Sequence, residues 1–315
     1  MNILGNGKML ITCPVCLGSE LKQKYIVSKK GFMSQPGHTH TLCLGCNSVL
    51  LDPQPTEEEL IDFYKSQTVE EDIEKEIAHA SLNRILDSVK YEYFFQHRIK
   101  PLQNYINKDT TIFDVGCGVG AFVKAMKDLG YMISGNDLSN VSLEIGRANY
   151  GLTKDELKYG DMKSLDNSDF GCITLWTVIE HLLHPEEYLE YLHGCLKPNG
   201  ILLIEFPTVD SLMFEKFKED FFWVMPPYHI YLYSIGGMKK LLDRAGFDVV
   251  LEYQMPRNWY FFDVLAKKSN MDSTMINHIK EQAPEFSVAI DTLLDDLAIE
   301  QNKSSSVQII ARKRS

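Results

Sequence analysis

Ile112-Phe113-Asp114-Val115-Gly116-Cys117-Gly118-Val119-Gly120-Ala121-Phe122 is the stretch of this chain that decides the fold. The apolar run predicts a buried strand, and the glycines after it predict a tight turn into a helix. Asp137 follows about twenty residues later, where a carboxylate suits the two hydroxyls of a ribose. Gly116, Gly118 and Ala121 also fit the dinucleotide fingerprint. This stretch alone therefore leaves two classes of cofactor open.

Short apolar runs alternate with helical segments from Thr111 onward. This alternation predicts a doubly wound, mostly parallel α/β sheet with helices on both faces. We expect strands at Ile112–Val115, Tyr131–Ser134, Cys172–Trp176, Ile201–Glu205 and Val307–Ala311, and helices at Phe122–Leu129, Ser142–Tyr150 and Glu186–Leu196.

Three further features separate the two cofactor classes. Asp114 ends the first expected strand, where it is suited to the amino group of a methionine moiety, and dehydrogenases need no acid there. Gly160-Asp161-Met162 follows the expected third strand and offers an acid and an apolar side chain to an adenine. Leu196-Lys197-Pro198-Asn199-Gly200 precedes the strand Ile201–Glu205.

Together these residues resemble the class I S-adenosylmethionine-dependent methyltransferases, over about residues 110–250. The resemblance implies a seven-stranded, Rossmann-like methyltransferase sheet. It also implies cofactor contacts: Asp114, Gly116, Gly118 and Gly120 around the methionine part, Asp137 on the ribose, and Leu138, Asp161 and Met162 at the adenine. Trp176 joins these cofactor-binding candidates. Gly171 and Asn199 depart from the family pattern at positions that do not touch the cofactor in that pattern.

Two CxxC pairs near the N-terminus, Cys13-Pro-Val-Cys16 and Cys43-Leu-Gly-Cys46, are separated by 26 residues. Four thiolates meet the tetrahedral preference of Zn²⁺, and a two-residue gap lets one turn aim two sulfurs at one ion. The pairs therefore predict a zinc ribbon whose closed metal site is structural. His38 and His40 are expected to be loop residues and not ligands.

The N-terminal region resembles one branch of the same family, which has such a ribbon followed by a DPxPT…FY stretch, here Asp52 to Tyr64. Many members of that branch resemble small-molecule methyltransferases, including sugar and natural-product enzymes. We expect a zinc ribbon at 1–55, a helical linker at 56–110, and a methyltransferase domain at 111–315 with a helical insert at about 259–304.

Two histidines are candidates for the general base, because both follow the carboxyl ends of expected strands, where ligands of open α/β sheets bind. His229 ranks first, since it ends the aromatic run Phe221–His229 and an ordinary imidazole pKa suits proton removal. His181 ranks second, with a capping role as its alternative. Phe221–His229 and Trp259–Phe262 are expected either to shield an acceptor pocket from water or simply to pack in the core.

Composition limits the partners. The formal net charge of −11 disfavours nucleic acid. No apolar stretch reaches about 18 residues, and the first residues lack the apolar core of a signal peptide. We expect a cytoplasmic protein without a membrane partner. An apolar stripe in the insert packs on its own domain or, as the second option, forms a homodimer face; it comprises Phe286, Ile290, Leu293, Leu294 and Leu297.

The sequence favours S-adenosylmethionine-dependent methyl transfer to a small-molecule oxygen or nitrogen, with carbon less favoured, on a sugar or secondary metabolite. Two alternatives stay open. One is a zinc-ribbon binding protein with a non-catalytic methyltransferase-like domain. The other is a protein or RNA methyltransferase, whose RNA form the acidic balance weakens.

Overall fold

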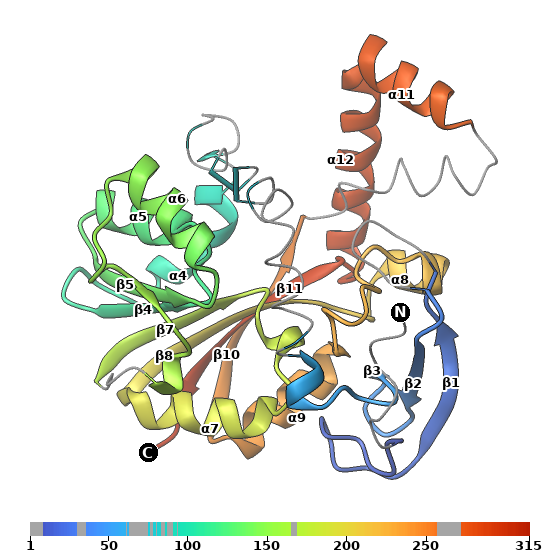
Figure 1. Cartoon of the computed structure of the whole chain (residues 1–315), viewed down its shortest axis with the longest axis horizontal. Helices are drawn as coiled ribbons and strands as arrows, with labels where there is room; N and C mark the ends of the chain where they lie inside the picture. Colours follow the sequence, from blue (N-terminus) through green and yellow to red (C-terminus); the bar gives the residue numbers. More distant parts are fainter. Residues whose placement is uncertain are drawn as a thin grey trace.

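A seven-stranded sheet forms the centre of this computed structural model, which describes residues 9–29, 36–60, 95–164, 169–256 and 272–315 and single positions between 62 and 94 (Figure 1). The strand order is β10-β11-β8-β7-β4-β5-β6. Five neighbouring strands are parallel, and β11 runs antiparallel to both β8 and β10. The bounds are β4 Thr111–Val115, β5 Met132–Asp137, β6 Leu157–Tyr159, β7 Phe170–Trp176, β8 Leu196–Pro207, β10 Phe247–Met255 and β11 Ser306–Lys313.

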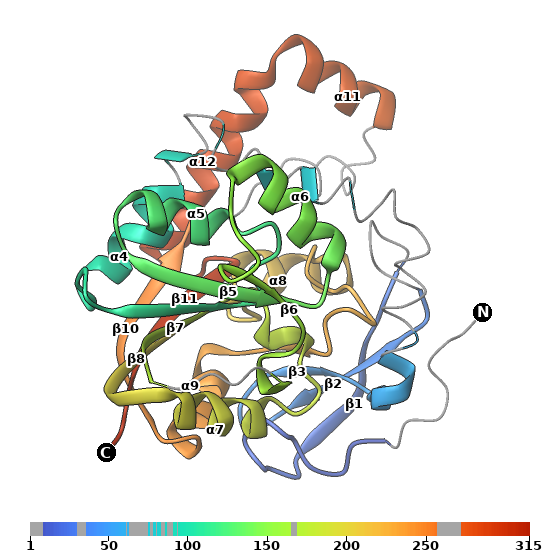
Figure 2. The same ribbon diagram turned by 60° about the vertical axis from the view of Figure 1, so that its left-hand side comes forward.

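Helices cover both faces of this sheet (Figures 1 and 2). One face packs against α4 (Lys100–Gln103) and α5 (Ala121–Asp128) through Ile112, Phe122 and Leu203. The other face packs against α7 (Pro185–Cys195) and α9 (Ile235–Arg244). No helix in the described part of the chain is both long and apolar enough to cross a membrane.

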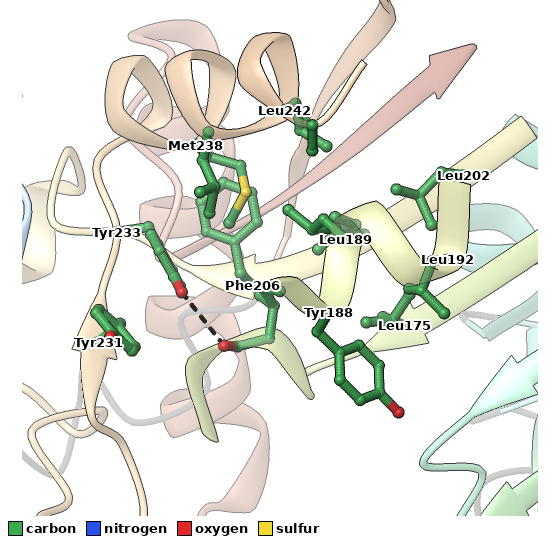
Figure 3. Close-up of a cluster of buried hydrophobic side chains, with 14 of the residues drawn as sticks. Leu175, Tyr188, Leu189, Leu192, Leu202, Phe206, Tyr231, Tyr233, Met238 and Leu242 are labelled. Atoms are coloured by element: carbon green, nitrogen blue, oxygen red, sulfur yellow. Dashed lines mark hydrogen bonds between the residues drawn. The ribbon is translucent and has the colours of Figure 1, made fainter. Parts of the chain in front are cut away.

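Alternation of side chains along the strands explains why both faces are apolar. Figure 3 shows Leu175, Leu202 and Phe206 of the sheet facing leucines of α7 and Met238 of α9. Strands covered on both sides read as continuous apolar runs, and β8 is buried without interruption from Gly200 to Pro207. These runs, with the α/β alternation, made the sheet predictable, and the doubly wound fold class is confirmed.

A second sheet has the order β1-β2-β3-β9, all antiparallel. Its strands are β1 Leu21–Val27, β2 Thr39–Cys43, β3 Val49–Leu51 and β9 Tyr231–Leu232. The first three come from the cysteine-rich region, whereas β9 comes from the segment after β8. The ribbon is therefore hydrogen-bonded into the methyltransferase part. His38 lies in a loop, as expected. The loop prediction for His40 is wrong, because His40 belongs to strand β2 and is buried.

Helices α11 (Ser273–Gln282) and α12 (Pro284–Glu300) lie between β10 and β11 in sequence and project from the sheet (Figure 1). Phe286, Leu293 and Leu297 of the predicted stripe are 52%, 68% and 38% exposed. The expectation that the stripe packs on its own domain is wrong for these three residues. A homodimer contact there stays a prediction. The predicted aromatic segment Trp259–Phe262 lies outside the described residues.

The other helical segments of the described residues are α6 and several shorter pieces. Residues Phe95–Ile99 form the π-helix η1 directly before α4, and α6 spans Asn140–Tyr150. Helix α8 spans Leu212–Phe217, and single helical turns are η2 Met162–Ser164, η3 Ile179–His181 and η4 Lys218–Asp220. The turn η3 follows β7 at the carboxyl edge of the sheet, so it carries its side chains into the region where α/β ligands bind.

Candidate active site and zinc centre

The glycine turn after β4 has the backbone that its sequence predicts. Gly116 and Gly118 have φ of 66° and 56°, a region in which side chains are strained. A Cβ on Gly116 would lie 2.7 Å from a methyl group of Val178, whereas one on Gly118 would meet nothing within 4 Å. Packing therefore requires the first glycine, and the second faces open space in which a ligand fits.

Asp137 at the end of β5 holds the glycine turn. Its Oδ2 accepts a hydrogen bond of 2.8 Å from the Gly118 N–H, and its Oδ1 accepts one of 2.8 Å from the Ser139 N–H. Each carboxylate oxygen has a second lone pair. The side chain can thus fix the turn and still accept hydrogen bonds from ribose hydroxyls, which stays a prediction.

Asp114 is buried below the same turn, only 1% exposed. Its Oδ1 accepts a hydrogen bond of 2.6 Å from the Thr174 hydroxyl on β7. Burial raises the pKa of Asp114 to about 7, while the Thr174 hydrogen bond and the charge of Arg98 act in the opposite direction. A cationic ammonium group bound nearby would favour the ionised carboxylate. This environment suits the predicted role toward the methionine amino group.

The other cofactor candidates occupy contrasting surroundings. Leu138 is 65% exposed, as expected of a side chain that a ligand covers. Asp161 accepts a hydrogen bond of 2.7 Å from the Lys163 N–H, and Met162 is fully buried in the core. Trp176 lies in the core between the sheet and α5, and its ring centroid is 4.9 Å from that of Phe122. Their contacts with adenine or cofactor stay predictions.

Sequence reasoning missed a buried ion pair beside this site. Arg98 of η1 donates to both carboxylate oxygens of Glu205 at the end of β8, at 2.7 and 3.1 Å. Its guanidinium also lies 4.9 Å from the Trp176 ring centroid. The two charges are 107 residues apart, so no local pattern links them. The pair satisfies a carboxylate that would be costly to bury alone and supports Trp176 from one side.

His181 and His229 meet although 48 residues separate them in the sequence. Their ring centroids are 4.8 Å apart with planes at 82°. His229 stacks on Trp223 at 5.6 Å between centroids, and its Nδ1 donates to the Trp223 carbonyl at 2.9 Å. Glu180 is fully buried beside them. These three side chains each offer a ligand atom, and the three atoms lie within 4.8 Å of one another.

The premise of an ordinary imidazole pKa at His229 is wrong. Burial, followed by the neighbouring His181, holds the pKa of His229 well below its usual value. Burial likewise lowers the pKa of His181 to about 4. Both rings are neutral at pH 7, so each keeps one unprotonated nitrogen. Neither histidine is therefore a base matched to cellular pH, but the unprotonated nitrogen of each ring can still accept a proton or bind a cation.

Backbone contacts fix the segment that carries Glu180 and His181. Thr177, where the chain leaves β7, has a φ of 57°, a strained value for a β-branched residue. The Ile230 N–H donates to the Glu180 carbonyl at 2.9 Å, and the Leu51 N–H donates to the Ile230 carbonyl at 2.9 Å. The ribbon strand β3 therefore reaches the candidate site through one intervening residue.

The four ribbon cysteines form a second cluster, with their ligand atoms within 4.8 Å of one another. The Sγ atoms of Cys13 and Cys46 are 3.8 Å apart, and those of Cys16 and Cys43 are 3.5 Å apart. Tetrahedral zinc with bonds of about 2.3 Å separates its sulfurs by about 3.8 Å. The residues therefore fit a zinc ion, and four thiolates leave it no open position.

Hydrogen bonds tie this cluster to α9. Ser234 caps α9 by accepting from the Gly237 N–H at 2.8 Å, and its hydroxyl donates to the Cys46 carbonyl. Arg244 at the other end of α9 donates to the Val15 carbonyl at 2.8 Å. Both CxxC turns are thus anchored to the methyltransferase part of the molecule.

The aromatic run Phe221–His229 after β8 was expected either to shield an acceptor pocket or to pack in the core, and its residues differ in this respect. Phe221 and Val224 are buried in a cluster with α8 and the ribbon, so they pack in the core. Trp223 instead supports His229. A cavity of about 550 Å³ lies between the ribbon, α8 and the segment after α12, with Tyr25, Asp210, Lys218 and Lys303 among its lining residues. Neither candidate histidine lines it.

One family of known proteins matches this chain. A family model described as a methyltransferase domain matches residues 88–252, just over half of the chain. The chain belongs to this family of methyltransferase domains, and its seven-stranded sheet has the class I methyltransferase topology.

Individual relatives are distant. A ubiquinone biosynthesis O-methyltransferase of Vibrio atlanticus (strain LGP32) is 26% identical over 158 residues, which cover 46% of this chain and 60% of that protein. A ribosomal protein L11 methyltransferase of Clostridium botulinum (strain Eklund 17B / Type B) is 42% identical over 55 residues, 17% of this chain and 18% of that protein. The chain spans less than two thirds of the length of these relatives.

Among solved structures, an S-adenosylmethionine-dependent methyltransferase from Mesorhizobium loti is 16% identical. The alignment covers 68% of this chain and 96% of that one, with a TM-score of 0.44.

Proposed function

We propose that the chain transfers the methyl group of S-adenosylmethionine to a small-molecule acceptor, with a hydroxyl oxygen favoured over nitrogen and carbon. The observation that carries the proposal is the convergence of Glu180, His181 and His229 next to the cofactor turn. Val178, two residues before Glu180, packs on Gly116 of that turn. Acceptor groups and sulfonium methyl would then meet at one edge of the sheet.

The chemistry is an in-line displacement at the methyl carbon, so the protein has to align the acceptor oxygen and take up its proton. His229 is the first candidate for the proton. Its Nδ1 already donates to the Trp223 carbonyl, which leaves Nε2 with a lone pair. His181 is the second candidate, as positioner or alternate base.

Two further observations support a small-molecule acceptor. The Vibrio relative is a ubiquinone biosynthesis O-methyltransferase, which acts on a small molecule. The net charge of −11 also argues against an RNA acceptor. A protein acceptor is the second candidate, because the Clostridium relative is a ribosomal protein methyltransferase. We further propose that the ribbon cysteines hold a structural Zn²⁺.

The test is a screen of hydroxyl- and amine-bearing metabolites with the full chain, read as release of S-adenosylhomocysteine. Once an acceptor is found, His229→Gln should lower kcat by about 10²–10⁴ with nearly unchanged cofactor affinity. A loss below tenfold would remove His229 from the role, and a large loss in His181→Gln alone would reverse the order. Turnover only with protein substrates would select the second candidate.

A further inference from the structure

The side chains of Glu180, His181 and His229 have the composition of a metal site with an open position. Two imidazoles and one carboxylate, with ligand atoms within 4.8 Å of one another, are the donor set of catalytic zinc centres and of other divalent transition-metal centres. Three protein ligands leave at least one coordination position for water or substrate. This differs from the ribbon, whose four thiolates close the shell.

The hydrogen bonds around the two imidazoles also support a metal site. A ring that ligates a metal through one nitrogen usually donates its other N–H to a carbonyl or carboxylate. His229 donates Nδ1–H to the Trp223 carbonyl, which frees Nε2. His181 hydrogen-bonds to the Tyr228 backbone, and its buried Nδ1 has no hydrogen-bond partner in the described ranges. Nδ1 of His181 is therefore the ring nitrogen that can bind a metal ion.

Burial and rigidity favour a bound cation as well. Glu180 is 0% exposed, and a nearby cation offsets the cost of burying a carboxylate. The backbone of Glu180 is fixed by the Ile230 N–H, and Ile230 adjoins His229. Ligands from two distant segments are thus held together by main-chain hydrogen bonds before any ion arrives.

We propose that Glu180, His181 and His229 bind one divalent transition-metal cation beside the cofactor turn, and that the acceptor hydroxyl occupies its open position. The role of the cation rests on the proposed function, but its binding does not. With the cation bound, Nε2 of His229 is a ligand and cannot also take up the proton, so the cation replaces His229 as the group that activates the hydroxyl. The coordinated hydroxyl has a lowered pKa and loses its proton to water. The oxygen then attacks the methyl carbon, and the electrons of the carbon–sulfur bond stay on sulfur, which leaves S-adenosylhomocysteine.

The experiment is a Co²⁺ titration of the full chain that carries one equivalent of Zn²⁺, held by the four ribbon cysteines, with all excess Zn²⁺ removed beforehand. We expect one equivalent of bound Co²⁺, with visible d–d bands and no thiolate charge-transfer band. X-ray absorption at the cobalt edge of the unmutated protein should show nitrogen and oxygen neighbours without sulfur. A sulfur shell would mean exchange into the ribbon, and that result or the absence of binding would overturn the proposal.

Variants locate the ion. His229→Gln and Glu180→Gln should each weaken Co²⁺ binding at least tenfold, whereas His184→Gln, at an exposed histidine three residues from His181, should leave it unchanged. Unaltered affinity in either ligand variant would contradict the assignment. S-adenosylmethionine affinity is measured on each sample. Cobalt binding without S-adenosylmethionine binding would contradict the proposed function and support the metal site. S-adenosylmethionine binding without cobalt binding would contradict the metal site and leave the proposed function intact.

Discussion

Asp114 shows how a single buried carboxyl links cofactor binding to pH. Its folded pKa of about 7 lies above the ordinary value of 3.8, because burial disfavours its charge. The folded state therefore binds more protons than the unfolded state between about pH 4 and pH 7, and stability falls as pH rises through this window. Thr174 and Arg98 limit the shift without cancelling it.

The prediction concerns Asp114→Asn, which keeps the shape of the side chain and removes its titration. The melting temperature of the unmutated protein should fall relative to that of the variant as pH rises from about 5 to 8. Affinity for S-adenosylmethionine should rise over the same range only in the unmutated protein, since the ligand ammonium favours the carboxylate. Thermal melts and calorimetry at several pH values check this, and parallel curves for both proteins would contradict it.

Helix α6 shows how an element can depend on one missing side chain. A Cβ on Gly146 would lie 2.0 Å from the Val119 carbonyl oxygen in the cofactor turn. Gly194, in α7, would meet nothing within 4 Å and is exposed. The same substitution should therefore have opposite effects in two helices.

Gly146→Ala should destabilise the fold by about 1–3 kcal/mol, because backbone has to move. Gly194→Ala should stabilise it by about 0.5–1 kcal/mol through helix propensity. Chemical denaturation measures both free energies of unfolding. Equal effects of the two substitutions would refute the packing argument for α6.

The elements differ in how far the sequence could predict them. Strands β4, β7 and β8 were predictable because they are continuous apolar runs, and the cysteine spacing predicted the four-sulfur cluster. Strand β9 could not be predicted from the sequence, because a strand of two residues has no periodicity and forms only by pairing with β3. The Arg98–Glu205 pair and the meeting of His181 with His229 likewise depend on tertiary structure. Asn199 at φ 61° shows asparagine in a left-handed position where the family often has glycine.

At the scale of the whole molecule, the ribbon and the methyltransferase part are coupled through Leu51, Ile230 and Glu180. Ser234 and Arg244 add contacts from the CxxC turns to α9. Loss of the ribbon metal should therefore disturb the Glu180–His229 region more than the glycine turn, which is held by Asp137.

Cys13→Ser together with Cys43→Ser should abolish tight zinc binding and lower the melting temperature by several degrees, because structural zinc contributes folding free energy. S-adenosylmethionine affinity should change less than about tenfold, whereas methyl transfer to an identified acceptor should fall further. Elemental analysis, thermal melts and calorimetry provide the readouts. A metal content near zero in the unmutated protein, with an intact fold, would contradict the zinc assignment.

The most direct measurement for this methyltransferase is calorimetric titration with S-adenosylmethionine, run in parallel with NADH. One site per chain with micromolar affinity is expected, since metabolite-fed enzymes work in that range. Asp137→Ala should weaken binding by roughly 2–3 kcal/mol, as charge-assisted hydrogen bonds are lost, while Asp155→Ala, at an exposed carboxylate, should leave it unchanged. Binding of NADH without binding of S-adenosylmethionine would contradict the assignment of the cofactor site.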